Sequence, residues 1–441
     1  MAGWQKVLAS FVVDVENHFD LLKYRLRERI GGRDPIMIVP YRGFGTAEKI
    51  YIKGRVLEDK GITSAMDNDS LWDNLVNMYR RFESDEIPYA RVRVRFQDAE
   101  QEAQANIEGF FEAWIETGGK LEEDKLWHSV EVELLEPQRP GYPRVHAEGQ
   151  VLVPPAGAQF GVISDIDDTV LQTDATHLIQ MARTVFLGNA RTRMPFKGVA
   201  AFYRALFHGG QAQGINPLFY VSSSPWNIYD LLSDFFSLQD IPIGPILFLR
   251  DWGISKEELL PTQHRSHKLE AIRKVLDLYP HLPFLLIGDS GQEDPEIYAE
   301  VVRLYPRRIL AIYIRNVSRD LKRPEAIHAL AKEVAEAGST LILADDTLPM
   351  ARHAAEQGWI PAEELPRIEV QKAADEAPPG PIEKLIGEEA PEAEAPTVVV
   401  EGEDSEETKE AVEQGAIETA LEDGKDESKK PPTVVVEGDE G

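Results

Sequence analysis

The sequence predicts an α/β protein whose main domain is built on a parallel sheet. A helix and a small antiparallel β-sandwich precede this domain, and a disordered acidic tail follows it. Three observations lead to this fold class: a change of hydrophobic period near residue 155, apolar runs alternating with helical patterns up to about residue 370, and a Glu-, Ala- and Pro-rich segment beyond it. The predicted domains are residues 1–32, 33–154, 155–370 and 371–441.

The composition narrows the class of protein. The chain has 441 residues, of which 43% are hydrophobic and 28% charged, as is typical of soluble globular proteins. It has no cysteine, which excludes disulfides, a thiolate nucleophile and zinc sites with sulfur ligands, so that a catalytic metal would need oxygen or imidazole ligands. No apolar run is long enough for a spanning helix, and Asp14 and Glu16 interrupt the short N-terminal one. We therefore expect a cytoplasmic protein without signal peptide or transmembrane segment, peripheral membrane contact remaining open.

The charge is strongly acidic, and the tail carries much of it. The net charge is −29, and residues 371–441 contain 22 acidic and 6 basic side chains, which gives −16. Such a chain repels nucleic acid, so no nucleic-acid partner is predicted. The tail repeats Pro-Thr-Val-Val-Val-Glu-Gly at 396–402 and 432–438. These repeats could add a strand to a protein partner, although repeat drift without function explains them better.

The first predicted element is an amphipathic helix. Apolar residues recur every three or four positions from Trp4 to Ile30, and Gly31 and Gly32 end the pattern. The end of this helix is basic, which would suit an anionic membrane surface, but packing on the rest of the protein explains the pattern better.

Residues 33–154 change to short runs of period two, which are typical of antiparallel strands. The strands are expected over 50–57, 90–96, 107–115, 130–135 and 145–153, with one helix inserted at about 70–82. Arg91, Arg93 and Arg95 fall on one face of a strand. A solvated face explains them at least as well as ligand binding does, and no chemistry is predicted for this domain.

Residues 155–370 predict a parallel sheet covered on both faces. The expected strands are 160–164, 218–221, 246–249, 284–287, 309–314 and 341–344, and helical patterns separate them. In such folds the functional residues lie beyond the carboxyl ends of the strands.

The first of these strands ends in three acids, Asp165, Asp167 and Asp168. Carboxylates at this density are unfavourable unless a cation neutralises them. A calcium loop would require glycine at Val170 and glutamate at Thr176, so that alternative is excluded. A merely solvated turn fits poorly, because the acids follow a buried strand.

Three further segments bring polar groups to the same edge of the sheet. Ser222, Ser223 and Ser224 follow the second strand, Lys268 lies near the start of a helix, and Asp289 and Asp294 follow the fourth strand. Each alone is ordinary, as a helix cap or a surface lysine. Together they supply carboxylates for Mg²⁺ and hydroxyl and ammonium groups for a phosphate.

In this order the four segments resemble the motifs of the haloacid dehalogenase phosphatases, over about residues 155–345. More narrowly, Asp-Ile-Asp-Asp-Thr, Ser-Ser-Ser-Pro-Trp and Gly-Asp-Ser-Gly-Gln-Glu-Asp resemble the Mg²⁺-dependent phosphatidate phosphatase family associated with fungal cortical actin patches. Bacterial relatives of that family pair the domain with an N-terminal β-domain. The resemblance implies a Rossmann-like sheet with a small cap or none.

The resemblance also implies roles for individual residues. Asp165 would attack phosphorus and form an aspartyl-phosphate, Asp167 would act as acid and base, and Lys268 would neutralise phosphoryl charge. The implied Mg²⁺ ligands are Asp165, Asp167 through its backbone carbonyl, and Asp289, with Asp294 supporting them from behind. The predicted substrate-binding residues are Ser222, with Ser223 as the alternative, Thr169 of the first motif, Arg191 and Arg193.

The two arginines come from a segment without acids. Residues 175–229 contain no Asp or Glu, and their basic residues are Arg183, Arg191, Arg193, Lys197 and Arg204. Packing of a helix pair explains the interleaved aromatics, whereas the lack of acids favours an anionic substrate or surface.

The resemblance implies an enzyme that hydrolyses phosphatidate to diacylglycerol and phosphate. The connections from the first to the second strand and from the third to the fourth are each too short for a large folded cap, so we expect an open site suited to a bulky or interfacial substrate. A phosphoprotein, nucleotide or sugar phosphate is the alternative substrate. A scaffold with a vestigial catalytic domain is the alternative of another class.

Overall fold

The computed structural model describes two sheets and the helices that accompany the second one. The described residues are 35–58, 86–119, 121, 125–139, 141–166, 198–210, 215–226, 229–250, 261–318, 320 and 322–376. The helices predicted over 4–30 and 70–82, most of the acid-free segment, and the tail from residue 377 lie outside these ranges.

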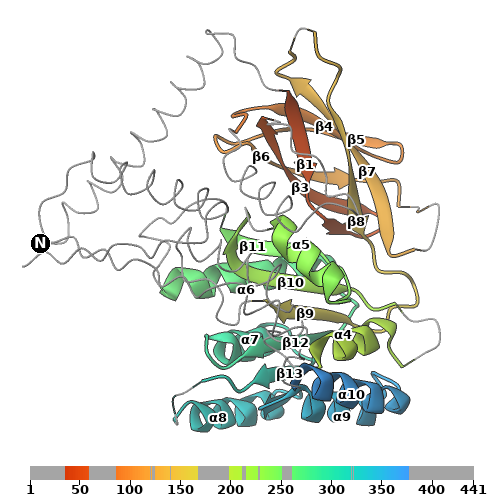
Figure 1. Ribbon diagram of the computed structural model, residues 1–441. Coiled ribbons are helices and arrows are strands. Elements are labelled where there is room, and N and C mark those ends of the chain that lie inside the picture. Colours follow the sequence, from red (N-terminus) through yellow and green to blue (C-terminus); the bar gives the residue numbers. More distant parts are fainter. Residues whose placement is uncertain are drawn as a thin grey trace, which may run out of the picture. The chain divides into compact units, whose positions relative to one another are not determined.

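The N-terminal sheet has eight strands (Figure 1). They are β1 (Ile36–Pro40), β2 (Gly43–Gly45), β3 (Lys49–Glu58), β4 (Arg91–Phe96), β5 (Ala99–Gln104), β6 (Phe110–Glu116), β7 (Trp127–Glu136) and β8 (His146–Leu152). The order is β1-β3-β2-β8-β7-β4-β5, with β6 on the other edge of β3. All pairs are antiparallel except β2 with β8.

This sheet folds over its own core. Apolar residues of β3 and β6, such as Ile52 and Phe111, pack in one buried cluster with those of β4 and β7, such as Val94 and Val132. The antiparallel strands were predicted, but a sandwich has two sheets, whereas one hydrogen-bonded path supplies both faces here. The difference arises because short β2 pairs with both β3 and β8 and so joins the two halves.

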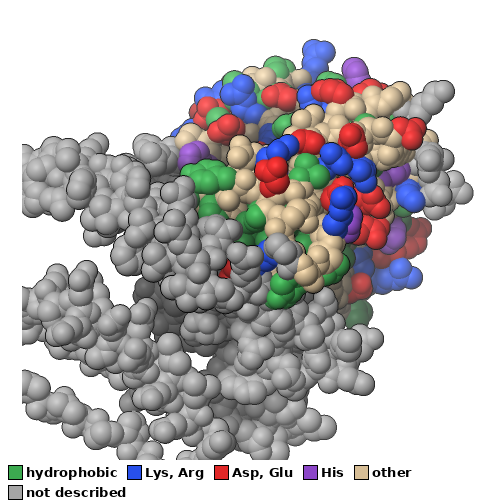
Figure 2. Space-filling view, turned by 90° about the horizontal axis from the view of Figure 1, so that it is seen from above, with side chains coloured by type: hydrophobic (Ala, Val, Ile, Leu, Met, Phe, Trp, Pro, Cys, Tyr) green, Lys and Arg blue, Asp and Glu red, His purple; other side chains and the backbone are tan. Residues whose placement is uncertain are grey.

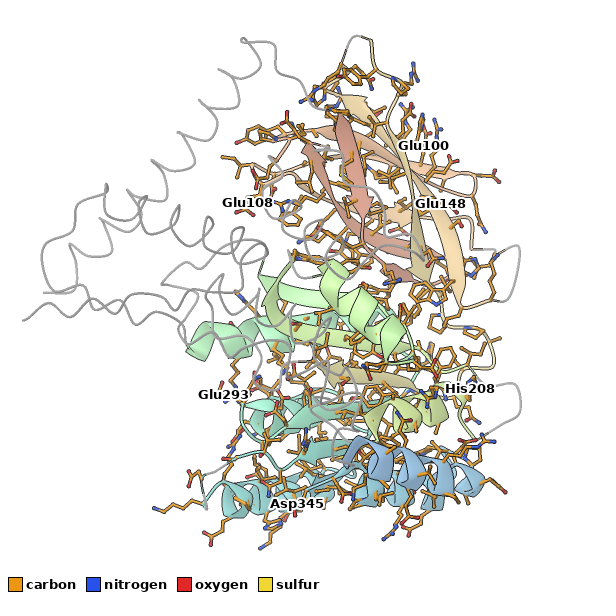
Figure 3. All side chains as sticks on the ribbon, viewed as in Figure 1. Glu100, Glu108, Glu148, His208, Glu293 and Asp345 are labelled. Carbon is orange, nitrogen blue, oxygen red and sulfur yellow. The ribbon has the colours of Figure 1, made fainter. Side chains whose placement is uncertain are left out.

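The arginine ladder of β4 lies on the outer face of this sheet. Val92 and Val94 are fully buried, and the alternate arginines face carboxylates of neighbouring strands. Arg93 is 3.1 Å from Glu102 of β5, and Arg95 is 3.2 Å from Glu100, which Figure 3 labels. The visible face of this region in Figure 2 accordingly interleaves cationic and anionic side chains. The arginines therefore form ion pairs across strands, which favours the solvated-face interpretation.

The second sheet has six parallel strands, in the order β11-β10-β9-β12-β13-β14. The strands are β9 (Gly161–Asp165), β10 (Leu218–Pro225), β11 (Ile246–Arg250), β12 (Phe284–Asp289), β13 (Ile309–Arg315) and β14 (Thr340–Ala344). The six strand predictions and the parallel sheet are confirmed.

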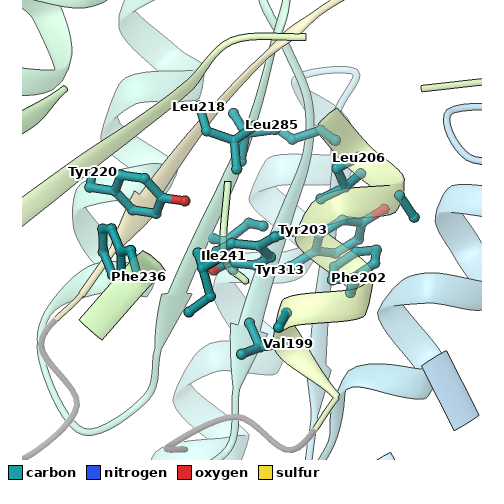
Figure 4. Close-up of a cluster of buried hydrophobic side chains, with 14 of the residues drawn as sticks. Val199, Phe202, Tyr203, Leu206, Leu218, Tyr220, Phe236, Ile241, Leu285 and Tyr313 are labelled. Atoms are coloured by element: carbon teal, nitrogen blue, oxygen red, sulfur yellow. The ribbon is translucent and has the colours of Figure 1, made fainter. Parts of the chain in front are cut away.

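Helices cover both faces of the parallel sheet (Figure 1). They are α4 (Val199–His208), α5 (Tyr229–Leu238), α6 (Pro261–Leu278), α7 (Asp294–Leu304), α8 (Arg323–Glu336), α9 (Thr347–Glu356) and α10 (Leu365–Glu376), with a short 3₁₀ turn, η2 (Ala362–Glu364). Side chains of α4, α5, α9 and α10 pack on one face and those of α6, α7 and α8 on the other. Figure 4 shows the first face, where Phe202 of α4 lies against Tyr313 of β13.

Neighbouring residues along the central strands point to opposite faces. Val162 and Leu285 belong to the first apolar cluster, and Ile163 and Leu286 belong to the second. This is why the strands read as continuous apolar runs in the sequence rather than as alternating ones.

The N-terminal sheet shares these clusters with the parallel sheet. Its Tyr41 packs 4.3 Å, centroid to centroid, from Trp226, which follows β10, and its Phe44 packs 5.9 Å from Phe219 of β10. The amide of Arg42 donates to the hydroxyl of Tyr229 at 3.0 Å. Aromatic residues from the N-terminal region therefore extend the apolar clusters on both faces of the parallel sheet.

Two further findings concern the start of the predicted tail and the search for membrane-spanning helices. Helix α10 continues to Glu376, so the first residues of the segment predicted as tail are helical. Among the helices that the structure describes, none is both long and apolar enough to cross a membrane.

Candidate active site

The parallel sheet has one position where the strand order reverses. From β9 the chain continues to β10 on one side, whereas β12 lies on the other side of β9. Helices leave the two neighbouring strands toward opposite faces at such a position, which opens a crevice beyond the carboxyl ends. Asp165 is the last residue of β9, and Asp289 is the last residue of β12. Both carboxylates therefore stand at the crevice.

Four ionisable side chains meet there almost out of contact with water. The exposed fractions are 9% for Asp165, 2% for Asp289, 0% for Asp294 and 1% for Lys268. The Lys268 ammonium is 2.8 Å from Oδ1 of Asp165 and donates a hydrogen bond to Oδ1 of Asp294. One oxygen of each aspartate lies within 4.8 Å of one oxygen of the other two. The sequence motifs after β9 and β12 and in α6 thus converge in one cluster.

The charges of this cluster leave an excess of negative charge. Burial alone would lower the pKa of Lys268, but the carboxylates of Asp165 and Asp294 outweigh this and raise the pKa above its ordinary value. Lys268 is therefore a cation, and it balances one of three carboxylates. Among the described side chains of the cluster, three carboxyl groups therefore surround one ammonium group. This excess and the all-oxygen donor set fit a divalent cation such as Mg²⁺.

The loop after β12 fixes the carboxylate of Asp289. Its Oδ1 accepts the backbone N–H groups of Gly291 at 2.6 Å and Gln292 at 3.1 Å. Arg323 of α8 holds the same loop by donating to the carbonyl oxygens of Ser290 at 3.0 Å and Gln292 at 2.6 Å. Arg323 is anchored in turn by Glu296, whose Oε2 is 2.8 Å away. The orientation of Asp289 is therefore set by backbone groups of its own loop.

Asp294 is held by a different set of contacts. It is the first residue of α7, where the helix dipole favours a negative charge. Its Oδ1 accepts from Lys268, and its Oδ2 accepts the backbone N–H of Asp289 at 3.2 Å. Because both oxygens are engaged, this carboxylate is placed to orient Lys268 and Asp289.

Gly288 allows the Asp294 side chain to pack closely against β12. A Cβ on Gly288 would lie 2.2 Å from Oδ2 of Asp294, closer than any carbon and oxygen can pack. We expect Gly288→Ala to lower the free energy of unfolding by about 1–3 kcal/mol, since overpacking forces Asp294 away from its partners. Denaturant unfolding of the two proteins measures the change.

A second glycine supplies the control for this substitution. A Cβ on Gly118 would meet nothing within 4 Å, so Gly118→Ala should be neutral or slightly stabilising. If Gly288→Ala is as well tolerated as Gly118→Ala, the close packing of Asp294 on β12 is not required.

A buried hydrogen bond lies on the other side of the nucleophile candidate. The hydroxyls of Ser164 and Tyr203 are 2.7 Å apart, and Ser164 also donates to the carbonyl oxygen of Asp165 at 2.8 Å. Burial, together with the charge of Asp165, raises the pKa of Tyr203, although its hydrogen bond to Ser164 opposes this. Tyr203 is thus a neutral phenol that fixes the end of β9 from α4.

Other predicted site residues are placed only in part. Ser222 is fully buried in β10, one residue beyond Val221, the parallel neighbour of Asp165. Thr169, Asp167, Arg191 and Arg193 lie outside the described residues. The side chain of Ser223 is not described either. The choice between Ser222 and Ser223 as the phosphate-binding residue therefore stays a prediction.

Residues that position the cluster were missed in the sequence. Arg323 stands in a plain amphipathic helix, where nothing distinguishes it from a surface arginine. Tyr203 was noted only as an aromatic in the acid-free segment. Gly288 directly precedes Asp289, and in the sequence this pair was the available sign that another side chain packs against the end of the strand.

Comparison with known proteins points to one kind of catalytic domain. Residues 160–316 match the family model described as phosphatidate phosphatase APP1, catalytic domain. Phosphatidate phosphatase APP1 of Saccharomyces cerevisiae is 34% identical over 163 residues, which are 37% of this chain and 27% of that protein. An uncharacterized protein of Schizosaccharomyces pombe is 34% identical over 165 residues, 36% of this chain and 26% of its own. The chain thus spans about a quarter of the length of these relatives.

Solved structures resemble the chain only weakly. A carbohydrate acetylesterase from Xanthomonas citri, XAC1771, matches with a TM-score of 0.26 and 10% identity over 69% of this chain and 66% of its own. A likeness of this size supports no conclusion about fold or function. The matched residues 160–316, by contrast, contain β9, β10 and β12 and all four members of the buried cluster. The chain therefore carries, in residues 160–316, a phosphatase domain similar to the catalytic domain of phosphatidate phosphatase APP1.

Proposed function

We propose that this protein is a Mg²⁺-dependent phosphatidate phosphatase of the haloacid dehalogenase type, with Asp165 as its nucleophile. The observation that carries this proposal is the buried cluster of Asp165, Lys268, Asp289 and Asp294 at the sheet crevice, inside the matched residues 160–316. A phosphomonoester brings two negative charges to a site, so only a centre with added cations can accept it.

The cluster fits a metal because its donors are carboxylate oxygens and its charge is uncompensated. Asp165 and Asp289 would hold Mg²⁺, and the ion would supply positive charge against the oxygens of the phosphoryl group. The two carboxylate oxygens of Asp294 accept hydrogen bonds from Lys268 and from the backbone amide of Asp289. These contacts support a role in orienting the site rather than in binding the metal.

The first chemical step belongs to Asp165. One of its carboxylate oxygens would attack phosphorus, and the alcohol oxygen of the substrate would leave opposite to it, giving an aspartyl-phosphate and the free alcohol. Lys268 lies against the same carboxylate and would neutralise the charge that the phosphoryl group brings. Ser222, buried within β10, would donate to a phosphoryl oxygen.

The second step returns the carboxylate. A water would attack phosphorus and release inorganic phosphate, and a base must take its proton. By the resemblance of the first motif, this base would be Asp167, which would previously have protonated the leaving alcohol oxygen.

The substrate is part of the proposal and needs its own experiment. We expect the full chain with Mg²⁺ to release phosphate from phosphatidate in mixed vesicles faster than from p-nitrophenyl phosphate or a phosphoserine peptide at equal phosphate concentration. Phosphate release is measured colorimetrically, and chelation of Mg²⁺ should abolish it.

The outcomes separate reaction from substrate. Activity on p-nitrophenyl phosphate without activity on vesicles would retain the mechanism and remove phosphatidate. The double variant Arg191→Glu/Arg193→Glu should lower the rate on vesicles more than on p-nitrophenyl phosphate if the acid-free segment meets an anionic surface. The absence of any Mg²⁺-dependent hydrolysis would favour the scaffold alternative.

A further inference from the structure

A cavity of about 260 Å³ lies between the N-terminal sheet and the edge of the parallel sheet near β11 and α6. It is smaller than the pockets of about 300–1,000 Å³ that hold drug-sized ligands. One wall is Phe44, Tyr51 and Lys53 of the N-terminal sheet, and the opposite wall includes Ile246 of β11 and Lys274 of α6. The two walls of the cavity therefore come from different sheets.

The cavity is separate from the active site, although both use α6. Lys268 points into the buried cluster, whereas His267, Ala271 and Lys274 line the cavity. Lys268 contacts Asp165 and Asp294, and none of these three residues lines the cavity.

Cations outnumber anions in the described lining. The cationic residues are Arg42, Lys53 and Lys274, and the anionic ones are Glu112 and Glu270. The Lys53 ammonium is 3.2 Å from Glu112, and it lies 4.9 Å from the ring centroid of Trp226. In a chain with a net charge of −29, a net positive cavity is a departure from the average surface.

Two of these cations have no carboxylate partner within the described part of the chain. The Lys274 ammonium lies 3.5 Å from the ring centroid of Tyr51 and makes no ion pair there. The Arg42 guanidinium donates only to neutral oxygens, to Ser233 Oγ at 3.1 Å and Tyr229 Oη at 3.4 Å. Burial lowers the pKa of Lys274, and the nearby charge of Lys53 adds to this against the opposing effects of Glu112 and Glu270. An anion bound between Lys274 and Arg42 would offset the unfavourable burial of the Lys274 charge.

The rest of the lining is apolar. Phe44, Tyr51 and Trp226 contribute rings, and Ile246 and Leu247 contribute aliphatic surface. An inorganic anion alone would leave this surface uncovered. We propose that the cavity is a second binding site that takes a small organic anion, a carboxylate or phosphate group on a short apolar or aromatic stem.

Benzoate and phenylphosphonate are suitable probes, because neither can be hydrolysed by a phosphatase. Titration calorimetry of the full chain without Mg²⁺ should show saturable binding of one or both probes with one site per chain. Binding of benzoate alone would assign a carboxylate ligand, and binding of phenylphosphonate a phosphate ester. The measurement needs no turnover, and the substitutions in the cavity distinguish binding there from binding at the buried cluster.

Two substitutions should change the affinity in opposite directions. Lys274→Met should raise the dissociation constant about tenfold or more, since a buried anion would lose its cation. Glu112→Gln should lower the dissociation constant, since it removes negative charge from the cavity, and damage to the fold cannot produce tighter binding. Lys332→Met, at an exposed position of α8, should change nothing. The proposal is overturned if neither probe binds saturably, or if binding is the same in Lys274→Met and Glu112→Gln as in the unaltered chain.

Discussion

Asp165→Asn is expected to abolish phosphate release, with a loss of about 10⁴-fold or more in turnover. The substitution keeps the size of the side chain but removes the oxygen nucleophile, and loss of a catalytic nucleophile has effects of this order. It also removes a carboxylate beside Lys268, whose ammonium is 2.8 Å from Oδ1 of Asp165. Initial rates with p-nitrophenyl phosphate and Mg²⁺ measure the effect.

A chemical trap distinguishes a nucleophile from a residue that only positions others. Borohydride reduction of enzyme quenched during turnover converts an acyl phosphate into an alcohol, so Asp165 should appear as homoserine in its peptide by mass spectrometry. Asp98→Asn, at an exposed turn of the N-terminal sheet, is the matched control and should retain full activity. Turnover by Asp165→Asn within about tenfold of the unaltered protein would rule out the proposed role.

Lys268→Met is expected to destabilise the metal-free protein by about 3–5 kcal/mol, the usual effect of removing one partner from a buried ion pair. The lysine side chain is only 1% exposed and contacts both Asp165 and Asp294. Without it three buried carboxylates would face one another. Denaturant unfolding in the presence of a chelator measures the loss, and Mg²⁺ should recover part of it because the cation then binds the more negative cluster.

The pH dependence of this effect follows from the raised pKa of Lys268. A cation whose pKa is higher in the folded than in the unfolded protein contributes its full stabilisation below the unfolded value of about 10.4, and loses it only as the pH rises through the folded value. The difference between the unaltered protein and Lys268→Met should therefore not be diminished by deprotonation of Lys268 between about pH 6 and 9. Lys332→Met should lie within about 0.5 kcal/mol of the unaltered protein. If Lys332→Met destabilised the protein as much as Lys268→Met does, the burial of Lys268 would not be the cause of the loss.

The strands of the parallel sheet illustrate where sequence reasoning succeeds. The six strands of the parallel sheet were predicted from apolar runs, because a strand covered on both faces must be apolar throughout, as Val162, Ile163, Leu285 and Leu286 show. The N-terminal region was predicted less well. Its alternating strands were recognised, but β2 has only three residues, and its pairing with both β3 and β8 makes one sheet of what reads as two.

The sequence by itself predicted which residues form the candidate site, since Asp165, Asp289, Asp294 and Lys268 belong to motifs that can be recognised along the chain. Only the tertiary structure decided how they meet. Lys268 and Asp165 are about a hundred residues apart, and their 2.8 Å contact depends on α6 packing against β10 and β11 on one face of the parallel sheet. The support from Arg323, Tyr203 and Gly288, and the cationic cavity around Lys274, likewise arise from packing. Sequence patterns record the burial and period of each segment, whereas contacts between distant segments are set by how the completed sheets and helices fit together.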